Sequence, residues 1–100
     1  MKLKHSKEII KHDIDGLLEI TVEPFVDFRG EIWSIYQDVS FLPKFVEDKV
    51  SISKKNVLRG LHGDFNTWKL ITSLHGSFFL AVVDIRPESK TYNQAKTFKI

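Results

Sequence analysis

The feature that most constrains the fold of this chain is a succession of short runs rich in β-branched and aromatic residues, each ended by turn-forming residues. The runs predict strands at residues 17–22, 31–36, 48–53, 57–62, 68–74, 77–85 and 95–100. Helical periodicity is almost absent, and many short strands at regular spacing are typical of an all-β sandwich or barrel. The sequence therefore predicts an all-β fold of the jelly-roll kind.

Two of these runs carry more specific expectations. Residues 77–85 are apolar on both faces, which is typical of a central strand covered on both sides. The preceding His75-Gly76 dipeptide predicts a tight hairpin turn that joins this strand to residues 68–74. The aromatic side chains expected in the core are those of Trp33, Trp68, Phe78 and Phe79.

Composition excludes several classes of protein. The chain has 100 residues, no cysteine, and a formal net charge of +2 from 15 basic and 13 acidic residues. This length suits one domain, residues 1–100, and the lack of cysteine excludes disulfide scaffolds, thiol nucleophiles and zinc ribbons. The charge balance does not indicate a nucleic-acid partner, and no apolar run is long enough for a signal peptide or a membrane span. We expect a soluble, cytoplasmic protein.

The stretch most suggestive of chemistry is Asn-Val-Leu-Arg-Gly-Leu-His-Gly-Asp at residues 56–64. A histidine at a strand end, beside glycines that permit close approach of a ligand, is a candidate general base. Strand alternation places Arg59 and His62 on opposite faces, so a twist or bulge at Gly60 is needed to bring them to one pocket. The alternative is that His62 is an ordinary surface or core histidine.

Lys69 follows His62 by seven residues, after a predicted turn. Pairing of the two flanking strands in a hairpin would place its ammonium group near His62. A base and a cation in one cavity suit removal of a proton next to a carbonyl, because the cation stabilises the enolate oxygen that forms. The alternative is that Lys69 is a solvated strand lysine.

The pattern of acidic residues and histidines argues against a metal site. Jelly-roll barrels often bind metal through His-x-His and a following glutamate, but here residue 64 is aspartate and no glutamate occurs between Glu47 and Glu88. His5 and His12 lie in a charged N-terminal segment and are expected to be solvated. We therefore expect no metal site.

Five ordered blocks resemble the dTDP-4-dehydrorhamnose 3,5-epimerase family, over a region from about Leu17 to the end of the chain. The blocks are Asp27-x-Arg29-Gly30, Phe45-Val46-x-Asp48, Val57-Leu58-Arg59-Gly60-Leu61-His62, Lys69-Leu70 with Gly76, and Val83-Asp84-Ile85-Arg86-x-x-Ser89-x-Thr91. The resemblance implies a cupin-type jelly roll, a homodimer without metal or cofactor, and a nucleotide-diphosphate sugar as substrate.

The resemblance also implies roles for particular residues. His62 resembles the base that abstracts a proton at C3 or C5 of a 4-keto sugar nucleotide, and Lys69 resembles the lysine that stabilises the enolate. Arg59 resembles a substrate-contacting arginine. Arg29 resembles one that holds the nucleotide diphosphate, often from the partner subunit; arginine suits this task because its guanidinium binds phosphate through two parallel hydrogen bonds.

The residues that differ from the family pattern lie at positions where the resemblance implies contacts with the nucleotide and the sugar. Ile32 and Ser34 replace an aromatic residue and a glutamate, and Glu47 and Lys49 replace a glutamine and an asparagine. Ser34, Glu47 and Lys49 are therefore expected to bind substrate. The strings Arg29-Gly30-Glu31-Ile32-Trp33, His62-Gly63-Asp64 and Thr67-Trp68-Lys69-Leu70 resemble the branch that epimerises GDP-linked 4-keto heptoses for surface polysaccharides.

The length of the chain bears on its domain organisation. Members of the family are longer than this chain, and the resemblance places their reprotonating tyrosine and their histidine-orienting aspartate beyond Ile100. We therefore expect residues 1–100 to be the N-terminal portion of a jelly-roll epimerase domain. The alternative is a truncated, non-catalytic module that binds sugar nucleotides or dimerises.

Overall fold

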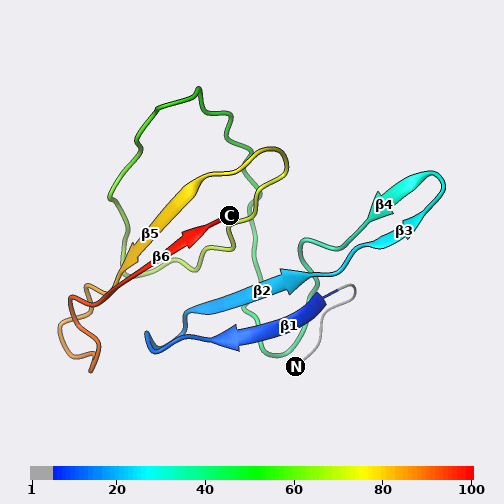
Figure 1. Ribbon diagram of the computed structural model, residues 1–100. Helices are drawn as coiled ribbons and strands as arrows, with labels where there is room; N and C mark the ends of the chain where they lie inside the picture. The colour runs from blue at the N-terminus through cyan, green and yellow to red at the C-terminus, as the bar shows by residue number, and fades with distance from the viewer. Residues whose placement is uncertain (1–5) are drawn as a thin grey trace. The chain divides into compact units, whose positions relative to one another are not determined.

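A computed structural model describes residues 6–100 of the chain (Figure 1). Within this range the regular elements are all strands, and no helix is present to cross a membrane. The strands are β1 (Ser6–Lys11), β2 (Leu18–Val22), β3 (Phe25–Asp27), β4 (Gly30–Ile32), β5 (Phe79–Val83) and β6 (Ala95–Lys99). The all-β prediction is confirmed.

The six strands form three antiparallel, two-stranded sheets: β1 with β2, β3 with β4, and β5 with β6. Each strand pairs with its neighbour in sequence, which antiparallel strands can do through a short connection. This arrangement of small antiparallel sheets is consistent with a cupin-type jelly roll. The expected strand at 31–36 is shorter than predicted, because its pairing with β3 ends at Ile32.

Strand β1 was not among the predicted strands, because its sequence is charged and lacks a long apolar run. Its apolar pair, Ile9 and Ile10, faces Ile20 and Glu19 of β2 in the sheet register. Glu8 is also tied to β2, since its backbone N–H donates to Thr21 Oγ1 at 3.0 Å. Pairing with a neighbouring strand thus overrides a weak local propensity.

The expectation that His12 is solvated is wrong; His5 lies outside the described residues. The side chain of His12 is only 14% exposed, and its Nε2 lies 3.0 Å from Oε1 of Glu19 on β2. Its ring also meets Phe98 of β6 edge-on, with centroids 5.3 Å apart. A partner strand and an aromatic neighbour, neither visible in the local sequence, remove this histidine from water.

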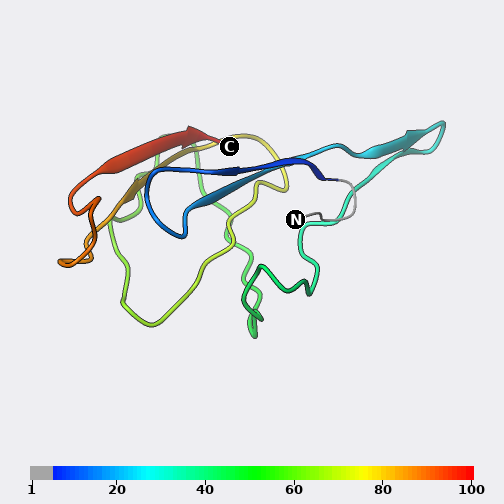
Figure 2. The same cartoon turned by 90° about the horizontal axis from the view of Figure 1, so that it is seen from below.

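Strands β5 and β6 lie side by side in both views (Figures 1 and 2). Phe78 and Ile100 extend the ladder by two reciprocal backbone hydrogen bonds of 2.9 Å. The predicted hairpin at His75-Gly76 is wrong: this dipeptide forms a bend, and residues 68–74 form no strand. The partner of β5 is instead β6, because the turn at 84–94 closes that pair. β5 is therefore not the covered central strand predicted, since β6 is its only strand neighbour among residues 6–100.

Residues 38–71 contain no strand (Figure 1), so the strands predicted at 48–53 and 57–62 are also wrong. Alternation of apolar and polar residues predicts which face of a strand is buried, but it does not supply the neighbour that must accept its backbone hydrogen bonds. This segment is one compact unit, and residues 6–37 and 72–100 belong to the other.

The buried hydrophobic side chain of the described residues is Ile14, which is 7% exposed at the turn between β1 and β2. The prediction that Trp68 and Phe79 belong to a core is wrong, because they are 62% and 72% exposed. Phe78 is 40% exposed, and Trp33 is half-buried. Two-stranded sheets have too little surface to enclose large aromatic side chains.

Candidate active site

The predicted catalytic residues, His62 and Lys69, both lie in the unit formed by residues 38–71 and are both exposed. The strand pairing that was expected to bring them together is absent, because neither flanking segment is a strand. The two residues are joined instead by a structured turn. Its organising residue is Asp64.

Asp64 accepts hydrogen bonds from two residues of this turn. The Thr67 hydroxyl donates to its carboxylate, at 2.6 Å from Oδ1 and 2.7 Å from Oδ2, and the Asn66 backbone N–H donates at 2.8 Å. These hydrogen bonds, the Thr67 hydroxyl first among them, lower the pKa of Asp64, with a smaller contribution from the positive charge of Lys69. The turn between His62 and Lys69 is thus built around an ionised carboxylate.

Arg59, a predicted substrate-binding residue, precedes His62 by three residues in the sequence. Its Nε donates a hydrogen bond of 2.9 Å to Ser53 Oγ. Gly60 follows it with a φ of 97°, a backbone conformation that side-chain-bearing residues rarely adopt. The backbone therefore departs from the simple strand alternation that would place Arg59 and His62 on opposite faces.

Glu47 and Lys49, two of the predicted substrate-binding residues, form an ion pair with each other. Lys49 Nζ lies 3.0 Å from Glu47 Oε1, and the side chains are 83% and 65% exposed, respectively. An exposed ion pair of this kind contributes little to stability. Both side chains are therefore accessible to a ligand.

Arg29 and Ser34, the remaining predicted binding residues, belong to the other unit. Arg29 lies in the turn between β3 and β4, with its side chain 74% exposed and paired with Asp27. This pairing lowers the pKa of Asp27 and raises that of Arg29, because each stabilises the charge on the other. Ser34 is half-buried two residues after β4 ends.

Among residues 6–100, the side-chain cluster with the most described hydrogen bonds centres on Asp84, in the last of the motifs that resemble the family. Asp84 is buried, and its carboxylate accepts five hydrogen bonds: three from the backbone N–H, Nε and Nη2 of Arg86, and one each from the Ser89 and Thr91 hydroxyls. These partners, Arg86 first, hold the pKa of Asp84 well below its usual range. The signal in the sequence was the run of Asp, Ser and Thr after an apolar strand, which is typical of a side-chain-bonded turn.

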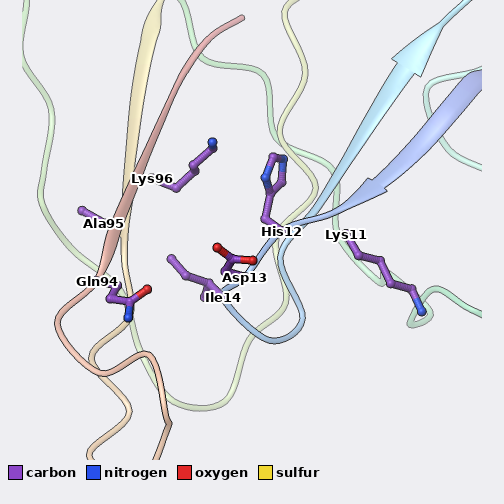
Figure 3. Close-up of a pocket in the computed structure, with 7 residues that line it drawn as sticks. All are labelled: Lys11, His12, Asp13, Ile14, Gln94, Ala95 and Lys96. Atoms are coloured by element: carbon purple, nitrogen blue, oxygen red, sulfur yellow. The ribbon is translucent and has the colours of Figure 1, made fainter.

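A small pocket is lined by none of the predicted site residues. Figure 3 shows its lining residues, which come from the end of β1 and the following turn on one side and from the start of β6 on the other. Residues 11–14 and 94–96 line it. Basic and acidic side chains are mixed there, so no single ligand charge is favoured. Among residues 6–100, no group of His, Asp and Glu side chains is arranged to hold a metal ion.

Comparisons with known proteins agree with the residue pattern. The family model described as dTDP-4-dehydrorhamnose 3,5-epimerase matches residues 11–100. Proteins of that name are 36% identical over 95 residues in Escherichia coli (strain K12) and 39% identical over 95 residues in Salmonella typhimurium. A third, from Methanothermobacter thermautotrophicus, is 35% identical over 92 residues.

These alignments cover 86%, 86% and 85% of this chain, but only 51%, 52% and 50% of the three relatives. The chain thus spans about half the length of the curated relatives it matches. No solved structure gives a significant match. Since the family model covers most of the chain, the chain belongs to the dTDP-4-dehydrorhamnose 3,5-epimerase family.

Proposed function

We propose that the protein is a nucleotide-sugar 3,5-epimerase that works by proton abstraction next to the C4 ketone of a 4-keto sugar nucleotide. The observation that carries this proposal is the family match over residues 11–100, which contains both candidate catalytic residues. Residues 1–100 would then be the front part of one jelly-roll domain. The match supports an enzyme over a non-catalytic module.

In this mechanism His62 takes the proton from C3 or C5. Imidazole suits this step because its ordinary pKa lies close to neutral pH. Lys69 stabilises the negative charge that develops on the C4 oxygen as the enolate forms. A separate acid then returns a proton to the opposite face of the carbon, which inverts the configuration.

Substrate binding is assigned to Arg29, Arg59, Ser34, Glu47 and Lys49. Arg29 would bind the diphosphate and Arg59 the substrate beside the base. The relatives are named for a dTDP-linked sugar, which supports dTDP as the nucleotide. The strings at residues 29–33, 62–64 and 67–70 resemble the branch that acts on GDP-linked 4-keto heptoses, and this supports such a heptose as the second candidate.

The proposal also covers the location, assembly and biosynthetic role of the enzyme. An enzyme of this kind acts in the cytoplasm as a homodimer, in the synthesis of surface polysaccharides. The family resemblance supports the homodimer, because it implies that a partner subunit often supplies the arginine corresponding to Arg29. Sedimentation of the protein with and without dTDP tests the dimer.

The experiment that tests the reaction follows deuterium entering the sugar in D₂O by proton NMR, with dTDP- and GDP-linked 4-keto sugars. We expect exchange at C3 or C5, and we expect His62→Asn to slow it by about 100-fold or more, since general bases contribute that much. His75→Asn is the matched control, because His75 is exposed and lies outside residues 38–71. Nucleotide binding without any exchange would support the non-catalytic module instead.

A further inference from the structure

The tip of the β3–β4 hairpin presents an arginine in an unusually defined orientation. Asp27 pairs with Gly30 in the sheet register, so Phe28 and Arg29 form a two-residue turn. The backbone N–H of Arg29 donates to Asp27 Oδ1 at 2.9 Å. Gly30 directly follows the turn with a φ of 131°, a backbone conformation that residues with a side chain rarely adopt. The backbone that carries Arg29 is therefore fixed on both sides.

The side chain of Arg29 is fixed as well. Its Nε lies 3.2 Å from each oxygen of Asp27, and its Nη2 donates to Oδ2. The guanidinium carbon also lies 5.9 Å from the centre of the Phe28 ring, which is within the range of a cation–π contact. One edge of the guanidinium thus faces the carboxylate, and an aromatic ring flanks it.

These contacts leave the other edge of the guanidinium open. Arginine has five N–H donors in a planar fork, and the bonds to Asp27 come from Nε and Nη2. In the interactions described for residues 6–100, Nη1 and the outer hydrogen of Nη2 have no acceptor. These are the two parallel donors that bind a phosphate through two hydrogen bonds. The side chain is 74% exposed, so a ligand can reach this edge.

We propose that Asp27 is a positioning residue that holds Arg29 by its Nε edge and so presents the Nη1–Nη2 edge to the diphosphate of the sugar nucleotide. The inference rests on the proposed function, which assigns Arg29 to that diphosphate. Fixing a long side chain before the ligand arrives removes part of the entropy cost of binding. Asp27 acts on the ligand through Arg29.

The direction in which nucleotide affinity changes when Asp27 is replaced separates this positioning role from a simple charge effect. Asp27 is negatively charged, so if it acted only through its charge, its removal would strengthen the binding of an anion. If it positions Arg29, its removal weakens binding instead. Asp27→Asn keeps the size of the side chain and an acceptor for the Arg29 backbone N–H, so it isolates the loss of the carboxylate.

The test is calorimetric titration of the protein with dTDP and with GDP. We expect Asp27→Asn to weaken binding of the preferred nucleotide by about threefold to tenfold, which is the scale of ordering one long side chain. Glu31→Gln is the matched control, because it removes one negative charge from the same hairpin and no described interaction joins Glu31 to Arg29. We expect this control to leave binding unchanged or slightly tighter.

A double-mutant cycle completes the test. Arg29→Lys lacks the fork, so we expect Asp27→Asn to cause no further loss in that background. Binding by Asp27→Asn that is unchanged or tighter, while Arg29→Ala weakens it, would overturn the positioning role alone. If Arg29→Ala has no effect, or the unsubstituted protein binds neither nucleotide, the proposed function fails as well.

Discussion

Two turns in this protein are each built around an aspartate, yet they differ in how firmly they are held. The Asp84 carboxylate is 1% exposed, accepts five hydrogen bonds and closes a turn between two paired strands. The Asp64 carboxylate accepts bonds from Thr67 and Asn66 in an exposed segment without strands. The same turn chemistry therefore operates in both places.

The difference between these turns comes from their surroundings. Beside Asp84, backbone bonds of 2.9 Å and 2.7 Å to Gln94 and Asn93 continue the β5–β6 ladder. Arg86 also donates from Nη2 to the Asp15 carbonyl at 2.9 Å, which ties the turn to the one between β1 and β2. A local turn becomes a rigid element when paired strands and a distant contact support it. Among residues 6–100, neither paired strands nor a distant hydrogen bond is described for the Asp64 turn.

The largest effect that we predict comes from Asp84→Asn. The substitution leaves Arg86, Ser89 and Thr91 without their shared negative acceptor, and charge-assisted hydrogen bonds are the strong ones. We expect amide hydrogen exchange in β5 and β6 to quicken by about 10- to 100-fold. Asp64→Asn is the matched control, and we expect it to leave exchange in β5 and β6 unchanged.

Equal effects of the two substitutions on β5 and β6 would contradict this comparison. Protection in these strands would then depend on the chain as a whole, and the Asp84 cluster would be no more than an ordinary turn. Unchanged amide protection of β5 and β6 in Asp84→Asn would likewise show that the Asp84 cluster does not stabilise this strand pair.

Lowering the pH should reduce the amide protection of β5 and β6 gradually, and by less than Asp84→Asn does. The pKa of Asp84 is held well below its usual range by Arg86, and the pKa of Asp64 is lowered less. A carboxyl group whose pKa is lower in the folded state contributes stability that is fully present above its unfolded pKa. That stability is lost as the pH falls through the folded pKa.

We therefore expect exchange protection of β5 and β6 to be constant from neutral pH down to about 4, the ordinary pKa of aspartate, and to fall below it. Carbon-13 shifts of the two carboxyl groups provide the direct measurement. Asp84 should titrate at a lower pH than Asp64. The reverse order would show that exposure, and not hydrogen bonding, sets these pKa values.

The same comparison explains which elements the sequence predicts. Strands β2, β5 and β6 lie within predicted runs because their apolar residues also find a partner close in sequence or across one turn. The runs at 48–53, 57–62 and 68–74 have similar patterns but no partner strand among residues 6–100. Periodicity reports the face that a strand buries, whereas pairing depends on residues elsewhere.

The candidate site divides in a similar way. Residue types and their order predict His62 and Lys69 as candidates, because the chemistry of proton abstraction requires a base and a cation. The order of residues did not reveal that Asp64 shapes the turn between them or that Asp27 holds Arg29. Those contacts depend on the backbone geometry of turns, which the pattern of apolar and polar residues in strands does not predict.

The smallest effect that we predict concerns Glu47 and Lys49. Their ion pair is exposed, so Glu47→Gln should change the free energy of unfolding by less than about 0.5 kcal/mol. If Glu47 binds substrate and takes no part in the proton transfer, the same variant should change KM for the 4-keto sugar nucleotide while kcat stays within about twofold. Glu88→Gln, in the Asp84 turn, is the matched exposed control and should change neither quantity. A loss of more than about 1 kcal/mol in Glu47→Gln would show that residues 38–71 are held more firmly than the Asp64 turn indicates.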